Sequence, residues 1–216
     1  MPKRALIVAN GSIPDWGVIE TEAAHAALFI ACDGAANRIW RGSLFPDIVI
    51  GDLDSYKPLI PNGTPSFELI EDPDQETNDL EKALNLAKKR ECDEVVVLGA
   101  TGGRTDHALK NLSVLQAFTK KFHALVFKDM FGHYLVSDGF YSAPMQPGTV
   151  VSLFPMTGRV DSIFTEGLRY PLIWEPLQNG VRDGSSNEAV ADAVSVRHTK
   201  GELLIFVGDG PLSEHG

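Results

Sequence analysis

The pattern of apolar residues in the first 130 positions predicts alternating strands and helices. Apolar runs without polar alternation are typical of strands buried on both faces. These runs occupy residues 5–9, 28–32, 48–50, 67–70, 95–98 and 124–127. Helical spacing of apolar residues occupies 18–27, 35–41, 78–91 and 108–120. Such alternation predicts a parallel sheet with helices on both faces, a three-layer, Rossmann-like α/β domain.

The pattern changes near residue 138. Glycine and proline become frequent, and short strand-like runs follow one another without helices between them. These runs are 150–154, 160–164, 194–198 and 203–207. Short strands separated by turn residues predict a β-sandwich or a barrel. Of these two we predict the β-sandwich. The chain should therefore consist of an α/β domain at 1–138 and an all-β sandwich domain at 139–216.

Composition narrows the classes of partner. The 216 residues carry a net charge of −10, which disfavours a protein that binds nucleic acid through its overall charge. The two cysteines, Cys32 and Cys92, are far apart and are typical of reduced packing residues. No apolar run reaches the length of a membrane span. We expect a cytoplasmic protein with no membrane or nucleic-acid partner.

Acidic clusters follow several of the predicted strands. Asp52 and Asp54 come directly after the strand at 48–50, with Gly51 at its exit. The carboxyl ends of parallel strands meet at one edge of the sheet. We therefore expect one small region to hold Asp33, Asp52, Asp54, Asp79 and Asp106. So many carboxylates repel one another unless cations lie between them, and hard divalent cations prefer oxygen ligands. A polar turn is the alternative for any single pair.

Residues 99–104 form a glycine-rich loop between a strand and a helix. Its backbone N–H groups and the helix N-terminus suit a phosphate, although a plain helix entry explains the loop equally well. The loop lacks the P-loop and dinucleotide-binding patterns. Arg104 offers a planar fork for phosphate, or a partner for Asp106. In the second half, Tyr170 and Trp174 suit stacking on a flat ligand, or the core of a sandwich.

Taken together and in order, these motifs resemble the thiamine pyrophosphokinase family over nearly the whole chain. The matching segments are Asp33–Asn37, Gly51–Ser55, Gln75–Ala83, Gly99–His107, Gly167–Tyr170 and Ser186–Asn187. The resemblance implies a nucleotide-binding α/β domain, a β-sandwich, and a homodimer with thiamine bound between its subunits. The chain departs from the family at Asn78, where Thr is usual, and at Tyr170, where some relatives carry Trp.

The resemblance also implies the reaction ATP + thiamine → AMP + thiamine diphosphate. It implies catalytic and Mg²⁺-binding roles for Asp52, Asp54 and Asp79. The residues it implies for ATP are Asp33, Asn37, Gly102, Gly103, Arg104, Asp106 and His107. Those it implies for thiamine are Gln75, Asn78, Tyr170, Ser186 and Asn187. Asp52 and Asp79 are the alternatives for the group that takes the proton of the thiamine hydroxyl.

Three other functions compete with this one. Asp52-Leu53-Asp54 resembles the D-x-D motif of haloacid-dehalogenase-like phosphatases, but those place it on the first strand and have Thr or Val at the position of Tyr56. A non-catalytic nucleotide or thiamine sensor would not need five aspartates. A pyrophosphokinase of another heterocyclic alcohol, such as a pterin, would also release AMP.

Overall fold

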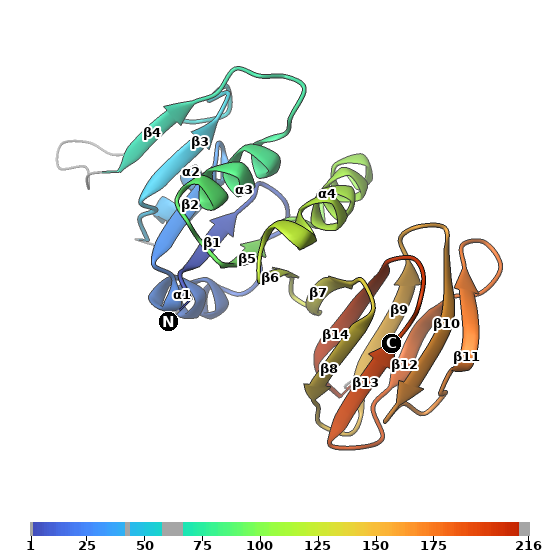
Figure 1. Ribbon diagram of the computed structural model, residues 1–216. Coiled ribbons are helices and arrows are strands. Elements are labelled where there is room, and N and C mark those ends of the chain that lie inside the picture. Colours follow the sequence, from blue (N-terminus) through green and yellow to red (C-terminus); the bar gives the residue numbers. More distant parts are fainter. Residues whose placement is uncertain (1, 42–43, 58–66, 212–216) are drawn as a thin grey trace. The chain divides into compact units, whose positions relative to one another are not determined.

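The computed structural model describes residues 2–41, 44–57 and 67–211 (Figure 1). The chain forms two compact units, Met1–Met130 and Phe131–Gly216. The division expected at residue 138 lies at the end of strand β7 (Gly132–Ser137), inside the second unit.

A parallel sheet forms the centre of the first unit, in the strand order β6-β5-β1-β2-β3-β4. Its strands are β1 (Arg4–Val8), β2 (Leu28–Cys32), β3 (Ile48–Gly51), β4 (Glu68–Glu71), β5 (Glu94–Leu98) and β6 (Ala124–Lys128). The central strands are buried almost throughout, as their continuous apolar sequences require. The predicted parallel α/β architecture is confirmed.

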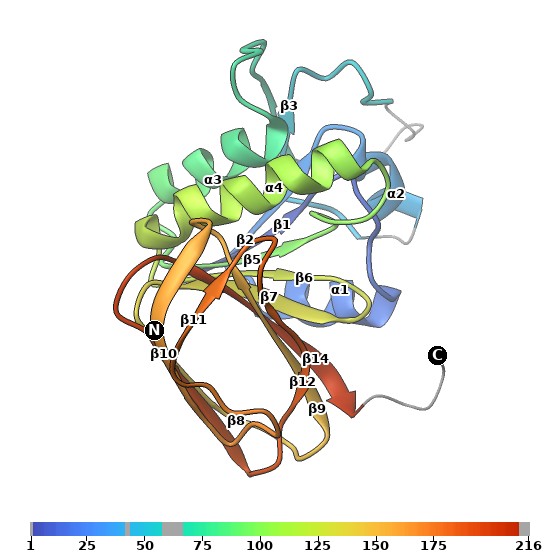
Figure 2. The same ribbon diagram turned by 90° about the vertical axis from the view of Figure 1, so that its right-hand side faces the viewer.

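Helices cover both faces of this sheet. They are α1 (Trp16–His25), α2 (Ala35–Arg41), α3 (Asp79–Lys89) and α4 (Thr105–Phe118), the last followed by a 3₁₀ turn, η1 (Thr119–Lys121). Ile19 of α1 and Ile39 of α2 share one apolar core with Leu6 of β1. Figure 2 shows α3 and α4 across the opposite face. The three predicted layers are therefore present.

A capping box sets the start of α3. The Asn78 side chain accepts a hydrogen bond from the Glu81 N–H (2.9 Å), and the Glu81 carboxylate accepts one from the Asn78 N–H (3.0 Å). This reciprocal pair satisfies two N–H groups that the helix itself leaves without acceptors. The predicted apolar face of α3 is buried, and Lys82 is buried with it.

The second unit is a β-sandwich, as predicted. The order of neighbouring strands is β12-β9-β14-β7 in one layer and β11-β10-β13-β8 in the other, all antiparallel. The remaining strands are β8 (Phe140–Pro144), β9 (Thr149–Pro155), β10 (Arg159–Glu166), β11 (Ile173–Gln178), β12 (Gly184–Glu188), β13 (Ala193–Arg197) and β14 (Leu203–Pro211). Val151, Val160 and Ile205 belong to the shared apolar core.

Strand β12 is not among the strands that the apolar pattern predicts. Its segment, Gly-Ser-Ser-Asn-Glu, has no apolar residue. Pairing with β9 nevertheless makes it a strand, and Asn187 is its buried position.

Among the helices of the described part of the chain, none has the length and apolar character of a membrane span.

Candidate functional site

A cavity of about 770 Å³ in the first unit lies where parallel strands end. Its walls come from the segments after β1, β3 and β5 and from the beginnings of α3 and α4. The lining residues include 9–12, 74–80, Cys32, Arg38, Asp52, Lys82, Ala100, Gly102, Gly103, Arg104, His107, Lys110 and Asn111. The carboxyl ends of parallel strands are the usual place for a ligand in this architecture.

Three carboxylates lie together beside this cavity. Asp33, Asp52 and Asp54 each present an oxygen within 4.8 Å of the other two. Asp33 follows β2 and the other two follow β3, so the pairing of these neighbouring strands brings their ends together. The backbone is left-handed at Asp33 (φ 35°) and at Leu53 (φ 62°). Such conformations at non-glycine residues are unfavourable and are concentrated at functional sites.

Gly51 allows this close approach. A Cβ atom at residue 51 would lie 2.8 Å from the Asp33 Cβ and 3.1 Å from the Asp79 Oδ1. Any larger residue would therefore push the end of β3 away from Asp33 and from the first residue of α3. The motif therefore requires glycine at residue 51, because the side chains of Asp33 and Asp79, far away in sequence, occupy the space that a larger residue would need.

The electrostatics of the group favour a cation. Burial raises the pKa of Asp33, and the charges of Asp54 and Asp52 raise it further. The Oδ1 atom of Asp33 is buried and has no hydrogen-bond partner within the described ranges 2–41, 44–57 and 67–211. A buried carboxylate oxygen without a partner is costly, and a hard divalent cation with oxygen ligands would satisfy it. The donor set therefore fits such a cation.

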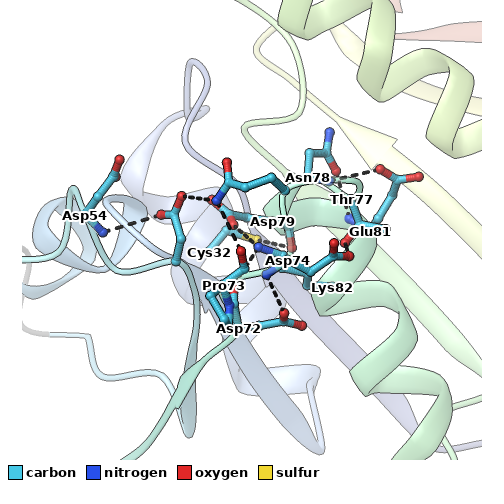
Figure 3. Close-up of polar contacts among 12 residues, drawn as sticks. Cys32, Asp54, Asp72, Pro73, Asp74, Thr77, Asn78, Asp79, Glu81 and Lys82 are labelled. Atoms are coloured by element: carbon cyan, nitrogen blue, oxygen red, sulfur yellow. Dashed lines mark hydrogen bonds and ion pairs between the residues drawn. The ribbon is translucent and has the colours of Figure 1, made fainter.

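Asp79 lies next to the group but has a cation of its own. Its Oδ1 is 3.6 Å from the Nζ of Lys82, which is buried and also donates to the Asp72 carbonyl (2.7 Å) (Figure 3). Burial raises the pKa of Asp79, the charge of Lys82 opposes this, and the charges of Asp52 and Asp33 add to it. The third carboxylate grouped with Asp52 and Asp54 is therefore Asp33, which the resemblance implied for ATP, and not Asp79. A metal-binding role for Asp79 stays a prediction.

Gln75 approaches the carboxylates from the loop before α3. Its Nε2 lies 3.5 Å from Asp52 Oδ2 and 3.3 Å from the Pro73 carbonyl oxygen. The Asp74 carboxylate shapes the same loop by accepting from the Glu76 N–H (3.0 Å) and the Thr77 hydroxyl (2.8 Å). The loop therefore places a neutral amide, Gln75, beside Asp52 at the wall of the cavity.

The glycine-rich loop packs against the segment that follows β1. Gly102 and Gly103 have positive φ values of 79° and 71°. Gly11 N–H donates to the Gly99 carbonyl and Ser12 N–H to the Thr101 carbonyl, both at 2.8 Å. Residues 9–12 also line the cavity, and our sequence analysis did not assign them to the site. The available signal was Asn10-Gly11 at the end of a buried strand, on the same edge as the aspartates.

Arg104 and Asp106 form a pair at the entry to α4. The Arg104 Nη2 is 2.6 Å from Asp106 Oδ2, and both side chains are exposed. The hydrogen bonds from Arg104 lower the pKa of Asp106 to about 2. Arg104 and His107 line the cavity. Of the five aspartates expected to meet, Asp33, Asp52 and Asp54 lie together, Asp79 lies near Asp33 and Asp52, and Asp106 is paired with Arg104.

Two residues of α2 support the loops of the site. The Asn37 Nδ2 donates to the Ser55 carbonyl (2.8 Å), and its Oδ1 accepts from the Lys57 N–H (3.0 Å). Arg38, which we did not predict, donates to the Gly11 carbonyl at 2.7 Å. Both side chains hold backbone segments of the site in place.

The remaining predicted residues belong to the second unit. The Tyr170 side chain is 68 % exposed. The buried amide of Asn187 accepts from the Tyr170 N–H (3.0 Å) and donates to its carbonyl (2.8 Å). Ser186 is exposed and has a left-handed backbone (φ 56°). Asn187 therefore fixes the backbone of Tyr170 and leaves the aromatic ring accessible.

Comparison with known proteins agrees with this arrangement. The family model "Thiamin pyrophosphokinase, catalytic domain" matches residues 19–127, and "Thiamin pyrophosphokinase, vitamin B1 binding domain" matches residues 141–203. Thiamine pyrophosphokinase 2 of Oryza sativa subsp. japonica is 29 % identical, over 90 % of this chain and 82 % of its own length. Thiamine pyrophosphokinase of Bacillus subtilis (strain 168) is 24 % identical, over 83 % and 86 % of the two chains.

Solved structures show the same fold. The structure of thiamine pyrophosphokinase from Bacillus subtilis aligns with a TM-score of 0.84 at 23 % identity, covering 95 % of this chain and 99 % of that one. Yeast thiamin pyrophosphokinase aligns with a TM-score of 0.79 at 16 % identity, covering 96 % and 86 %. Each family model falls within one of the two compact units. The chain therefore belongs to the thiamin pyrophosphokinase family, with its catalytic domain in the first unit and its vitamin B1 binding domain in the second.

Proposed function

We propose that this protein transfers the pyrophosphoryl group of ATP to the hydroxyl group of thiamine, giving thiamine diphosphate and AMP. The observation that carries the proposal is the grouping of Asp33, Asp52 and Asp54 at the strand ends, beside a cavity that the glycine-rich loop also lines. Transfer of a phosphoryl group requires mainly positioning and charge stabilisation from the protein, and this arrangement is suited to both.

Asp33, Asp52 and Asp54 would hold Mg²⁺, with Asp79 beside them. The fit rests on the unpaired buried oxygen of Asp33 and on the three mutually close carboxylates. Bound there, Mg²⁺ would contribute charge stabilisation to phosphate oxygens. The resemblance implied Asp52, Asp54 and Asp79 as the residues that bind Mg²⁺. We add Asp33 to the ligands and set Asp79 beside them.

The N–H groups of Gly102 and Gly103, with Arg104 and His107, would bind the phosphates of ATP. Two successive residues of positive φ before a helix direct N–H groups toward an anion. Arg104 is exposed, so its pairing with Asp106 is weak enough to exchange for a phosphate oxygen. The guanidinium would then bind in a planar, bidentate manner.

Asp79 is our choice for the group that takes the proton of the attacking hydroxyl. Its pKa is raised, chiefly by burial, which makes it a stronger base than an exposed aspartate. Lys82 keeps the carboxylate oriented through the ion pair at 3.6 Å. The oxygen of thiamine would attack the β-phosphorus of ATP, and AMP would leave from the opposite side.

Thiamine would be bound through residues of both units. The exposed ring of Tyr170, held by Asn187, is suited to stack on the aromatic rings of thiamine, one of which is cationic. Ser186 lies next to Asn187, and Gln75 and Asn78 face the cavity of the first unit. The positive thiazolium ring is compatible with an acidic site.

We also propose a homodimer in which two chains share each active site. Support comes from the distribution of the candidate residues, since the carboxylates belong to the first unit and Tyr170 to the second. A C₂ dimer uses the same pair of surfaces twice, so two equivalent sites would form.

A cytoplasmic location remains our prediction. Cys32 and Cys92 are both buried and free, as expected in a reducing compartment. Fractionation of cells that produce the protein would test it.

The test of the function is direct. Purified protein should convert ATP and thiamine to equimolar AMP and thiamine diphosphate when Mg²⁺ is present. Release of inorganic phosphate would indicate a phosphatase, and binding without products would indicate a sensor. AMP formed only with a pterin alcohol would assign the protein to another pyrophosphokinase.

A further inference from the structure

A chain of side-chain hydrogen bonds joins the glycine-rich loop to the start of α3. Asn111 of α4 donates through Nδ2 to the Ala100 carbonyl (2.7 Å). Its Oδ1 accepts from the Nδ2 of Asn78 (3.0 Å), and the Oδ1 of Asn78 accepts from the Glu81 N–H (2.9 Å). Asn111 was not among the residues that the sequence indicated, although it lines the cavity.

The two ends of this chain fix its direction. The Ala100 carbonyl can only accept, so the amide of Asn111 must turn its nitrogen toward it. The Glu81 N–H can only donate, so Asn78 must turn its oxygen toward α3. Only one orientation of each amide satisfies all three hydrogen bonds. Asn78 is therefore engaged on both sides of its amide group.

We infer that Asn78 and Asn111 are a pair of positioning residues, which hold the first turn of α3 in register with the glycine-rich loop instead of contacting thiamine. Asp79 follows Asn78 directly and begins the helix, so its carboxylate moves with that turn. An error of about 1 Å in the place of such a group can cost roughly a hundredfold in rate. This inference rests on the proposed function and replaces the thiamine contact of Asn78.

Lys110 provides independent support for the role of α4. Its Nζ lies 2.9 Å from the Glu81 Oε2, the same carboxylate that completes the capping box. Two adjacent residues of α4 thus reach the first turn of α3, one through its charge and one through Asn78. The beginning of α3 is held by α4 as well as by its own cap.

Substitutions at residue 78 separate the cap from the connection to Asn111. Asn78→Asp retains a good N-cap, but its carboxylate would face the oxygen of Asn111. Satisfying it requires the Asn111 amide to rotate, which turns its oxygen toward the Ala100 carbonyl. Asn78→Thr can accept from the Glu81 N–H and donate its hydroxyl proton to Asn111. Valine has nearly the shape of threonine but no hydroxyl group, so Asn78→Val can do neither.

Steady-state kinetics with both substrates test the inference. We expect Asn111→Ala and Asn78→Asp to lower kcat and raise the KM for thiamine, reducing kcat/KM by roughly tenfold or more. Asn78→Thr should stay within about threefold of the wild type, and Asn78→Val should not. The double variant Asn78→Asp/Asn111→Ala should be no worse than either single variant, because both break one connection. Asn85→Ala, an exposed asparagine of α3, is the matched control.

Opposite results would overturn the inference. A fall in kcat that follows only the loss of folded protein, with both KM values unchanged, would make the pair merely structural. Additive losses in the double variant would make the two residues independent. An unchanged KM for thiamine in Asn111→Ala, with a raised one in Asn78→Ala, would restore a direct contact between Asn78 and thiamine.

Hydrogen exchange tests the connection between α3 and the glycine-rich loop even if the wild type forms no AMP. Asn111→Ala should speed exchange of backbone amides in the first turn of α3 and in residues 99–103 together, whereas Asn85→Ala should speed neither. Lack of AMP from the wild type would count against the proposed function alone. Unchanged exchange in Asn111→Ala would count against the connection between the two segments.

Discussion

Several asparagines of the candidate site bind the backbone of their own chain. Asn37 connects α2 to the turn at Ser55 and Lys57, and Asn187 brackets the peptide groups of Tyr170. The resemblance implied a ligand role for both. A side-chain amide has the donor and acceptor of a peptide group, so it can serve either purpose. Its partners lie well away in sequence, and only the folded chain reveals which purpose applies.

Asp54 provides a test of the proposed Mg²⁺ group at the level of one side chain. Asp54→Asn keeps the shape but removes one charged oxygen ligand from the group. We expect turnover to fall by roughly a hundredfold or more, because the cation stabilises developing charge. AMP formation at limiting Mg²⁺ measures the effect, and circular dichroism checks the fold. Near-normal turnover would remove Asp54 from the ligands, and exposed Asp15→Asn should have no effect.

Asp33 predicts an unusual dependence of stability on pH. Burial raises its pKa above the ordinary 3.8, so the native state holds the proton more tightly than the unfolded chain. This contribution to the free energy of unfolding is fully present below the unfolded pKa and is lost as pH rises through the folded pKa. Without divalent cations at pH 7, Asp33→Asn should therefore raise the unfolding temperature by about 2 °C or more.

The same substitution should lose this advantage in acid. At an acidic pH below its raised pKa the wild-type carboxyl takes up its proton, and the difference in unfolding temperature between the two proteins should shrink. Saturating Mg²⁺ at pH 7 should also stabilise the wild type more than Asp33→Asn, because a ligand that binds the native state stabilises it. Scanning calorimetry at both pH values, with and without Mg²⁺, measures all of these differences. A variant less stable than the wild type at pH 7 without cations would contradict the proposed repulsion.

Among the elements, those with a continuous or periodic apolar pattern were predicted well. The strands of the first unit and α2 were found within about a residue or two of their positions. The start of α4 was predicted at residue 108 but lies at Thr105, because its polar first turn has no apolar periodicity. β12 was missed for a related reason, since its stability comes from pairing with β9. Sequence patterns record burial, whereas caps and ladder hydrogen bonds depend on partners elsewhere.

Helix α3 allows the capping box to be tested as an element. Asn78→Ala removes the acceptor for the Glu81 N–H and should lower the free energy of unfolding by about 1 kcal/mol. The KM for thiamine should rise, and ATP affinity should hold. Urea denaturation and titration with ATP measure the two effects, with Asn85→Ala as the control for removing an asparagine from the same helix. A fall in ATP affinity with thiamine affinity intact would mean that the start of α3 supports the ATP site and not the thiamine site.

At the scale of the whole molecule, the two units correspond to the two domains of the family. The strand ends, their aspartates and the glycine-rich loop could be located from the sequence, because parallel strands determine where polar residues gather. Which of the five predicted aspartates lie closest together could not be located, since the close set Asp33, Asp52 and Asp54 depends on two left-handed residues and on the space left at Gly51. Local backbone geometry determined which carboxylates of the set that the topology had assembled lie closest together.

If two chains share each active site, two inactive variants should restore activity when they are combined in one dimer. Asp54→Asn and Tyr170→Ala should each be inactive or nearly so as homodimers. After subunit exchange, a mixed dimer would hold one site with both lesions and one with neither, so up to about half of the wild-type activity per mixed dimer should return.

Mass spectrometry under native conditions should confirm the exchange before activity is measured. Confirmed mixed dimers without activity would mean that each chain completes its own site. A protein that stays monomeric at assay concentrations and is fully active would exclude the dimer.

The burial of Cys32 gives the protein an internal reporter. Its thiol lies at the end of β2, donates to the Asp79 carbonyl (3.6 Å), and has a pKa raised well above 9.0, chiefly by burial. Although Cys32 borders the cavity, it is only 2 % exposed, so its thiol should react slowly with alkylating reagents until the surrounding strands separate. The chain has only one other cysteine, the buried Cys92, also in the first unit. Labelling kinetics would thus record the opening of the catalytic domain alone, without any introduced probe.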